Sequence, residues 1–399
     1  MYESLNNCDL TPRQEIETRI ANLQRKMMEN AIDYAVVLQN MDLFYLTGTL
    51  QKGVLIVRVD RPPLFFVEKS LERAAQESPL DIIPIRKDKD VGEIARKEGV
   101  KGTGAMELDV IPVALCERWK SILGSSNVLD ISPSIRDLRL IKSEFEIRQF
   151  IESGKIITRV FEKAKQIIRE GMREIDIEAE LIAEGRKAGH QGFLRMRGLN
   201  QEMMPGYVTQ GYSATIHSYA DVPIAGLGTT HAIAQGASNN RIVPGIPIIV
   251  DYGGGYNGYI TDETRTYAIG TLKDIFLKGY EVSRNIVDET IDFARSGIDA
   301  TEIFTRAAAR VKDANLEQYF MGHGEGQVSF AGHGLGLEIN ELPVITARHR
   351  TVLKEGMVFA FEPKFIIPGE GAVGIEVDFI VRKDGLERVT DSPLDIIYI

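Results

Sequence analysis

Two aspartates, Asp251 and Asp262, stand eleven residues apart in a segment whose pattern is typical of a β-hairpin. Residues 246–250 form a short apolar run that predicts a strand ending at Asp251. Residues 253–255 are three glycines, whose permissive backbone suits a turn. Residues 259–267 then return with tyrosine and threonine side chains that favour a second strand. The hairpin therefore brings both carboxylates to one point, and negative charge buried in this way usually serves a cation.

Three more candidate ligands follow, each beside an apolar run: His333, Glu362 and Glu376. Two aspartates, two glutamates and one histidine suit Mn, Co, Fe or Zn better than a structural zinc site, which would use cysteine. The negative charges of the carboxylates would be neutralised by two divalent ions. Two such ions about 3.5–4 Å apart activate a shared water.

Taken singly, each of these motifs has an ordinary explanation as a hairpin turn, a loop or a solvent-facing strand. Together, their order, spacing and flanking sequence resemble the superfamily of methionine aminopeptidase, aminopeptidase P, prolidase and creatinase, which has the pita-bread fold. The resemblance to its Xaa-Pro peptidase branch runs along nearly the whole chain. It is carried by Asp-x-Gly and Gly-Tyr-x-x-Asp-x-Thr-Arg-Thr at 251–266, Gly-His-Gly-x-Gly-Leu at 332–337, Glu-Pro at 362–363 and Ile-Glu at 375–376.

The resemblance implies a role for each of the five candidate ligands. Asp251 would chelate one metal ion, and Asp262 and Glu376 would bridge both ions. His333 and Glu362 would complete the second metal site. Glu362 is also the candidate to accept a proton from the attacking water and to deliver it to the leaving nitrogen.

We predict an α+β protein with two domains. Residues 1–138 alternate short strands and helices, which predicts an α/β domain of the creatinase N-terminal type. Arg139-Leu-Ile-Lys-Ser143 resembles the segment that precedes the catalytic domain in the family. Residues 139–399 are then expected to form the pita-bread catalytic domain, with amphipathic helices outside and the metal ligands on strands inside.

The sequence departs from the family pattern around the metal ligands. Asn340 replaces a histidine, and Asn cannot shuttle a proton at neutral pH. Ala234 stands where the family has another histidine, and the nearest one, His231, could act only through a different loop. Lys364 follows Glu-Pro in place of the usual glycine, and Gly374 stands where many aminopeptidases P have arginine.

The segment around Arg195 and Arg197 falls where the family lines its substrate region. Both arginines share one face if the segment is extended. They could pair with a substrate carboxylate, balance the acids of the metal site or face solvent. We predict substrate contacts from Arg197, Asn340 and His231, and a catalytic role for His231 beside Glu362.

The composition limits which binding partners and which cellular compartment are expected. A net charge of −10 and a pI near 5.3 argue against nucleic acid as a main partner. Cys8 and Cys116 are the only cysteines, so we expect no disulfide framework and a reducing compartment. The N-terminus has no signal-peptide pattern, and no uncharged run reaches the roughly 18 residues of a membrane helix. We therefore predict a cytoplasmic protein with no membrane partner.

The predicted function is that of a dinuclear metal-dependent peptidase. It would hydrolyse short peptides at Xaa-Pro bonds, as an aminopeptidase P or a prolidase, by attack of a metal-bridging water. Mn or Co is the expected metal, with Zn or Fe as alternatives, and the resemblance implies a homodimer. One alternative is a hydrolase or lyase that acts on a small non-peptide compound with the same fold. A binding protein that has lost catalysis is the other, which the retention of all five ligands disfavours.

Overall fold

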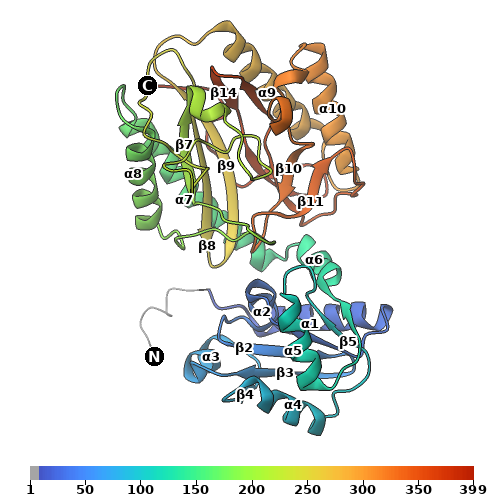
Figure 1. Cartoon of the computed structure of the whole chain (residues 1–399). Coiled ribbons are helices and arrows are strands. Elements are labelled where there is room, and N and C mark those ends of the chain that lie inside the picture. The colour runs from blue at the N-terminus through green and yellow to red at the C-terminus, as the bar shows by residue number, and fades with distance from the viewer. Residues whose placement is uncertain (1–8) are drawn as a thin grey trace. The chain divides into compact units, whose positions relative to one another are not determined.

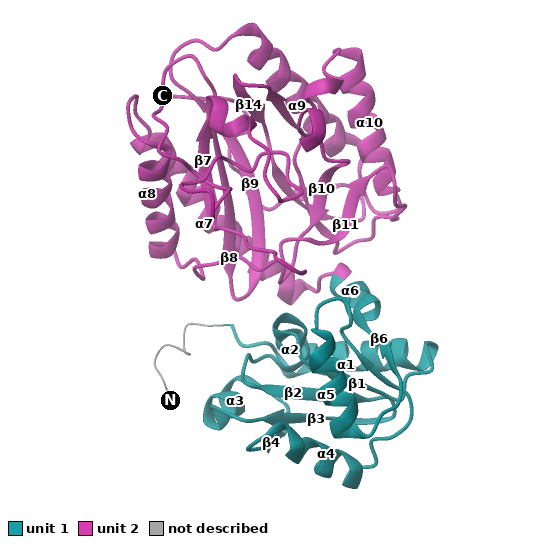
Figure 2. Ribbon diagram, viewed as in Figure 1, with its two compact units in different colours: residues 1–139 teal, residues 140–399 magenta. Residues whose placement is uncertain are grey.

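The computed structural model describes residues 9–399. The chain divides into two compact units, Met1–Arg139 and Leu140–Ile399 (Figure 2). The predicted boundary lies one residue away from this division. Of the two cysteines, Cys116 is partly buried and Cys8 lies outside the described residues. Among the helices of residues 9–399, none combines the length and the apolar character that a bilayer crossing requires.

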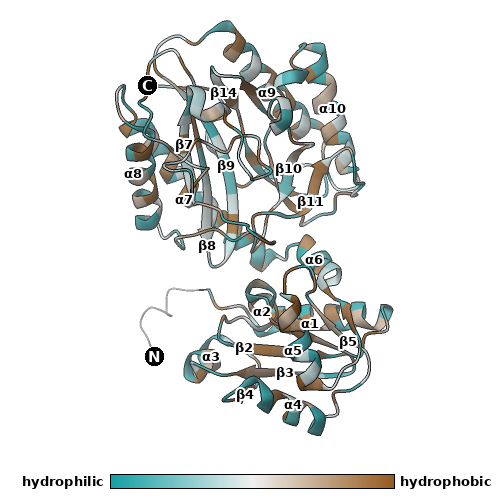
Figure 3. Ribbon diagram, viewed as in Figure 1, coloured by the Kyte–Doolittle hydropathy of each residue, from teal (hydrophilic) through white to brown (hydrophobic). Residues whose placement is uncertain are grey.

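The first unit is built on a six-stranded sheet in the order β4-β3-β2-β1-β5-β6 (Figure 1). The strands are β1 (Tyr34–Val37), β2 (Gly53–Arg58), β3 (Arg61–Val67), β4 (Ile82–Pro84), β5 (Gly104–Met106) and β6 (Val128–Asp130). The helices are α1 (Arg13–Glu29), α2 (Asn40–Thr47), α3 (Leu71–Glu77), α4 (Asp88–Lys97), α5 (Val113–Leu123) and α6 (Ser132–Leu140). Apolar strands pack with Trp119 of α5 and Val91 of α4 into one core, and the strands β2 and β3 are drawn brown in Figure 3. The alternation of strands and helices predicted for this part is therefore present.

The second unit contains three sheets. A four-stranded sheet has the order β17-β9-β8-β7, a five-stranded sheet has the order β11-β10-β12-β15-β16, and β13 pairs with β14. The first sheet contains β7 (Gly206–Gln210), β8 (Ile248–Tyr256), β9 (Tyr259–Ala268) and β17 (Ile397–Tyr398). The others contain β10 (Phe330–Gly334), β11 (Glu341–Thr346), β12 (Val358–Phe361), β13 (Lys364–Ile367), β14 (Gly371–Gly374), β15 (Val377–Val381) and β16 (Leu386–Arg388).

Four long helices cover these sheets from the outside (Figure 1). They are α7 (Glu144–Ile167), α8 (Glu174–Lys187), α9 (Asp274–Phe293) and α10 (Ala300–Asp313), and short 3₁₀ turns are η2 (Gly211–Thr215), η3 (Glu317–Tyr319) and η4 (Gly324–Gly326). Helix α7 packs on β8 and β9, α9 packs on β13 and β14, and α10 packs against β11. With helices outside and strands inside, the unit has the predicted α+β arrangement.

Helix α7 begins at a capping box. The Ser143 hydroxyl accepts a hydrogen bond from the Glu146 amide, and the Glu146 carboxylate accepts one from the Ser143 amide. Its apolar face then buries Ile157, Val160 and Phe161 in a core shared with the four-stranded sheet. This packing fixes the surface on which the β8–β9 hairpin lies.

The hairpin turns at a different place from the one predicted. Asn257 and Gly258, with φ of 49° and 90°, form the two-residue turn. Residues 253–255 belong instead to β8, which continues past Asp251 to Tyr256. A Cβ on Gly253 would lie 2.3 Å from Leu194 Cδ1, and one on Gly254 would lie 2.3 Å from Thr261 Oγ1. These glycines therefore serve close packing rather than the turn.

Candidate metal centre

Strand β9 is buried along its whole length although its middle is hydrophilic, as Figure 3 shows. Asp262 and Thr264 point to the same face because they are two residues apart on a strand. Asp251 of β8 lies directly opposite Thr264, and Gly253 lies opposite Asp262. The hairpin therefore presents both aspartates on one face, although Asp251 lies within its strand and not at its end.

The other three candidate ligands come from neighbouring strands. His333 lies on β10 and pairs with Ala360 of β12. Glu362 follows β12 directly, and Glu376 lies between β14 and β15, where its amide donates to the Thr264 carbonyl at 3.2 Å. The short loops that carry the two glutamates thus aim both side chains toward the face of β9 that holds Asp262.

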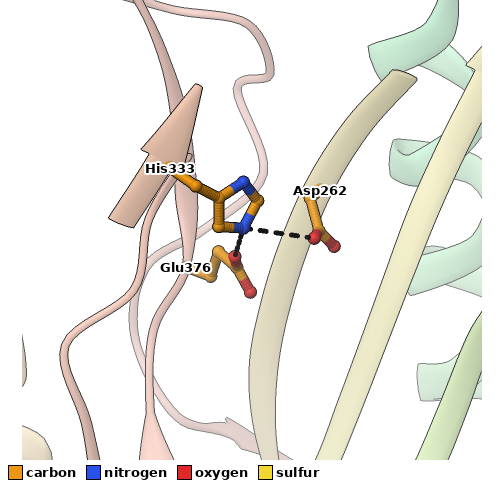
Figure 4. Close-up of side chains that lie close together, drawn as sticks. All are labelled: Asp262, His333 and Glu376. Atoms are coloured by element: carbon orange, nitrogen blue, oxygen red, sulfur yellow. Dashed lines mark ion pairs between the residues drawn. The ribbon is translucent and has the colours of Figure 1, made fainter. Parts of the chain in front are cut away.

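Asp262, Glu362 and Glu376 lie around the imidazole of His333, and Figure 4 shows the first and last of these with the histidine. Its Nε2 atom lies 3.8 Å from Asp262 Oδ2, 3.9 Å from Glu376 Oε1 and 4.0 Å from Glu362 Oε1. Metal bonds of about 2.1 Å in a tetrahedron place neighbouring ligand atoms about 3.4 Å apart. Asp262, His333 and Glu376 have ligand atoms that all lie within 4.8 Å of one another, so a modest contraction would convert these three into a metal site. One nitrogen with carboxylate oxygens is a donor set for a divalent transition metal.

A lysine lies on the other side of the same carboxylates. Lys364 Nζ is 2.7 Å from Glu376 Oε2, 3.0 Å from Glu362 Oε2 and 3.1 Å from Asp251 Oδ2. The lysine side chain is only 2% exposed. Sequence reasoning noted Lys364 as a departure from the family pattern but gave it no role.

Two hydroxyl groups also hold Asp251 and Glu376. Thr264 Oγ1 lies 2.7 Å from Asp251 Oδ2 and 2.8 Å from Glu376 Oε2. The Tyr207 hydroxyl lies 3.1 Å from Asp251 Oδ2. Three hydrogen-bonding groups therefore surround one oxygen of Asp251. The Thr-Arg-Thr motif was the only sequence signal for Thr264, and nothing in the sequence marked Tyr207.

Burial and mutual repulsion both disfavour the charged form of these acids. Burial, reinforced by the charges of Glu376 and Asp251, raises the pKa of Asp262 well above its usual range. Burial also raises the pKa of Glu376 to about 8, against the opposing effect of Lys364. The single ammonium of Lys364 therefore does not supply all the positive charge that the cluster needs, and a bound cation would supply more.

The five predicted ligands line one cavity of about 370 Å³ together with Lys364 and Asn340. Apolar side chains form much of the remaining wall, among them Leu194, Met196, Met203, Met204, Tyr219 and Phe330. The cavity thus opens an apolar space directly beside the cluster of acids, which is the usual character of a small-ligand site.

The structure does not bring His231 to this cavity. His231 is exposed in a turn, and the residues of its segment that line the cavity are Gln235 and Gly236, neither of which was predicted. The assignment of His231 as a catalytic or substrate-binding residue is therefore corrected. Ala234 beside it contributes no polar group to replace a histidine.

Arg197 is also placed differently from the prediction. Its guanidinium lies 3.5 Å from the Glu338 carboxylate and is buried, and Arg195 packs over the ring of Phe193 at 4.7 Å. Neither arginine lines the cavity, because the alternate residues Leu194 and Met196 take that position. The predicted contact of Arg197 with substrate is therefore replaced by an internal ion pair.

Asn340 lines the cavity, but its amide serves the backbone of Arg197. Its Oδ1 accepts from the Arg197 amide at 2.8 Å, and its Nδ2 donates to the Arg197 carbonyl at 2.9 Å. Asn340 therefore holds the wall segment in place through both polar atoms of its side chain.

Comparison with known proteins assigns the chain to a family. Residues 148–383 match the model of Metallopeptidase family M24, and residues 19–141 match that of the Creatinase/Prolidase N-terminal domain. The chain belongs to metallopeptidase family M24. As an M24 member it is a metal-dependent peptidase, as predicted, and the family implies divalent metal ions.

Relatives in family M24 match this chain over nearly its whole length. An Xaa-Pro dipeptidase of Pyrococcus furiosus is 27% identical over 387 residues, which cover 96% of this chain and 100% of that protein. The solved Xaa-Pro dipeptidase from Bacillus anthracis is 26% identical with a TM-score of 0.83, covering 96% of this chain and 100% of that one. The prolidase from Pyrococcus horikoshii is 25% identical with a TM-score of 0.80, covering 95% and 100%. These likenesses confirm the predicted pita-bread fold and the prolidase and aminopeptidase P branch.

Proposed function

We propose that this M24 peptidase hydrolyses short peptides at Xaa-Pro bonds with a divalent metal ion at the His333 side of the cluster. The observation that carries the proposal is the convergence of His333, Asp262, Glu362 and Glu376 beside an apolar cavity. The similarity to Xaa-Pro dipeptidases along nearly the full length supports the choice of substrate.

These four side chains would hold the ion. When bound, a divalent ion would polarise the carbonyl of the substrate and lower the pKa of a bound water. Oxygen ligands with one imidazole suit Mn²⁺ or Co²⁺, which we propose as the metal, with Zn²⁺ or Fe²⁺ as the alternatives.

Glu362 is the proposed carrier of the proton. Its Oε2 atom accepts a hydrogen bond from Lys364 Nζ at 3.0 Å. Its Oε1 atom faces His333 Nε2 at 4.0 Å and is the oxygen turned to the metal side. Oε1 is therefore the atom at which a proton from the attacking water would be held before transfer to the leaving nitrogen.

The apolar wall supports a substrate with a compact apolar residue beside the scissile bond. Leu194 and Met196 face the cavity from a segment that Asn340 holds by two hydrogen bonds. A proline ring buries apolar surface without a backbone donor that would need a partner. An apolar wall can therefore bury a proline ring without leaving a backbone N–H group of the substrate unpaired.

A homodimer and a cytoplasmic location remain predictions from the sequence. Light scattering of the purified chain tests the first: a mass of about 89 kDa, twice 44.4 kDa, is expected, and a monomer would contradict it. Fractionation of cells that express the natural protein tests the second.

A peptide panel tests the proposed activity. Metal-stripped protein with Mn²⁺ or Co²⁺ restored would be given Xaa-Pro dipeptides, Xaa-Ala dipeptides and longer Xaa-Pro peptides. We expect metal-dependent cleavage before proline, and a loss of roughly a hundredfold or more in Asp262→Ala because a metal ligand is removed. Dipeptides cleaved in preference to longer peptides would identify a dipeptidase, and the reverse an aminopeptidase.

Bound metal without cleavage of any peptide would overturn the proposal. The same preparation would then be assayed on small non-peptide amides, which the alternative reading of the fold requires. Activity that survives complete removal of metal would contradict the metal-dependent mechanism itself.

A further inference from the structure

The two glutamates of the cluster divide their oxygens between two positions. Glu362 and Glu376 each turn Oε1 toward His333 and Oε2 toward Lys364. Asp262 lies on the His333 side, and Asp251 Oδ2 lies on the Lys364 side. The cluster therefore offers one position bounded by a histidine and carboxylates, and a second bounded by carboxylates and hydroxyl groups without a histidine.

We infer that the chain binds a single divalent ion, at the His333 position, and that the ammonium of Lys364 replaces a second ion. The inference rests on the proposed function, because that function requires a divalent ion at the His333 position. It departs from the dinuclear site that the sequence predicts, and it makes Asp251 a partner of Lys364 rather than a metal ligand.

A metal ion at the second position would need the space that Lys364 occupies. It would have to lie about 2.0–2.2 Å from carboxylate oxygens that already contact Nζ. Those contacts are 2.7–3.1 Å long and come from three different residues, so Nζ fills the position between them. A divalent ion beside the ammonium would also be repelled by a like charge in a buried setting.

The lysine belongs to the sheet, and its side chain is almost completely buried. Lys364 pairs with Gly374 across the β13–β14 hairpin. A Cβ at Gly374 would lie 2.7 Å from Lys364 Cγ and 2.8 Å from Lys364 Cα. Only glycine therefore leaves the space that the lysine side chain uses, and the side chain is 2% exposed.

The charges agree with one ion. Four carboxylates face one ammonium and, in the inferred state, one divalent ion, which leaves a single negative charge. The Oδ2 atom of Asp251 also lies 2.7 Å from the Thr264 hydroxyl and 3.1 Å from the Tyr207 hydroxyl.

Counting bound metal tests the inference without an activity assay. The whole chain would be stripped, loaded with excess Mn²⁺, freed of unbound ion by gel filtration, and analysed by elemental mass spectrometry and electron paramagnetic resonance. We expect one Mn per wild-type chain with the spectrum of an isolated ion. Lys364→Gly opens the second position and should raise the count to two, with the spectrum of a coupled pair. Lys364→Ser serves the same purpose if the glycine variant does not fold.

Ligand variants show which position holds the ion. Asp251→Asn should keep one ion, whereas Asp262→Asn and His333→Ala should weaken its retention at least tenfold. Lys354→Ala, which changes an exposed lysine outside the cavity lining, should keep one ion. Two ions in the wild type, or loss of an ion in Asp251→Asn, would overturn the inference and leave the proposed function standing. No ion in the wild type would overturn both.

Discussion

Lys364 and Gly374 face each other across the β13–β14 hairpin, and the side chain of the first fills the space that the second leaves empty. The stem of the lysine passes over the glycine and delivers its ammonium to Asp251, Glu362 and Glu376. The position of a buried cation therefore depends on a residue that has no side chain. Any side chain at 374 must displace the lysine or the strand.

Gly374→Ala tests this dependence. The added Cβ would lie within 2.9 Å of Lys364 Cγ, Lys364 Cα and the Pro363 carbonyl, so the strand must shift. We expect a loss of about 1–3 kcal/mol in the free energy of unfolding, as for other overpacked sites, measured by chemical denaturation. The metal affinity should fall as well, because Glu376 follows two residues later.

Gly385→Ala is the matched control. A Cβ at Gly385 would meet no atom within 4 Å, so this variant should unfold as the wild type does. Equal stabilities of the two alanine variants would show that the hairpin adapts and that Gly374 is not required.

Thr264 ties Asp251 to Glu376 through one hydroxyl group. Its Oγ1 atom lies within 2.8 Å of a carboxylate oxygen on each of them. Thr264→Val keeps the shape and removes the hydroxyl, so a buried carboxylate oxygen loses a hydrogen-bond donor. We expect metal affinity to fall roughly 10–100-fold, as for other groups that orient metal ligands, measured by titration with a metal-sensitive dye.

Thr264→Ser keeps the hydroxyl and should retain most of the affinity. If the valine and serine variants bind metal equally well, the hydroxyl does not orient the ligands, and the role proposed for it would be wrong.

Asn340 holds the wall segment around Arg197, which lies far from it in the sequence. Its two hydrogen bonds to the Arg197 backbone cross 143 residues of chain. In Asn340→Ala both are lost, and the wall that carries Leu194 and Met196 should loosen. If about 1.4 kcal/mol of the free energy of these two hydrogen bonds is lost from substrate binding, KM should rise roughly tenfold while kcat changes little.

Limited proteolysis provides a second readout for Asn340→Ala. Cleavage near residues 195–204 should become faster than in the wild type. A drop in kcat with an unchanged KM would instead mean that Asn340 acts on the reacting groups, in place of the histidine that the family has there.

The strands, the long helices and the candidate ligands were predictable because each leaves a local pattern. The apolar run 246–250, the amphipathic run that became α7 and the motif around His333 all depend on residues close in sequence. The turn of the hairpin was misplaced because three glycines were given more weight than Asn257-Gly258, although Asn-Gly is the stronger signal for a two-residue turn.

Contacts between distant segments could not be predicted. Lys364 and Gly374 were both noticed as departures from the family pattern, but only the pairing of β13 with β14 shows that they are one structural change. Arg197 was expected at the substrate because its segment falls where the family lines its substrate region. Its partner Glu338 lies 141 residues away along the chain, so the sequence did not show the pair. His231 was expected near the site because it is the histidine nearest to Ala234, where the family has a histidine. Nearness in sequence does not show which way the side chains of a loop point.

His190 holds the β8–β9 hairpin as a neutral imidazole. Its Nδ1 atom accepts from the Gly192 amide at 2.9 Å, so the proton lies on Nε2, which donates to the Gly253 carbonyl at 3.0 Å. Burial, together with the charge of Arg186, lowers the pKa of His190 to about 4 although the Gly253 bond opposes this. Protonation would add a hydrogen to Nδ1, which could then no longer accept the hydrogen bond from the Gly192 amide.

The lowered pKa of His190 makes stability depend on pH with a definite sign. Between about pH 6.5 and 4 the unfolded chain binds a proton at this residue and the folded chain does not, so stability falls as the pH falls through this window. We expect this residue to contribute about 1–3 kcal/mol to the change in stability.

His190→Gln isolates this contribution. Glutamine has a donor and an acceptor but does not titrate, so the difference in unfolding free energy between wild type and variant should change by about 1–3 kcal/mol between pH 7 and pH 4, in the direction of a relatively less stable wild type at acid pH. The buried acids of the metal cluster have raised pKa values and act in the opposite direction, but they are common to both proteins and cancel in the difference. A difference that stays constant over this range would show that His190 is protonated equally in the folded and unfolded chains, and the neutral form assigned from its two hydrogen bonds would then be wrong.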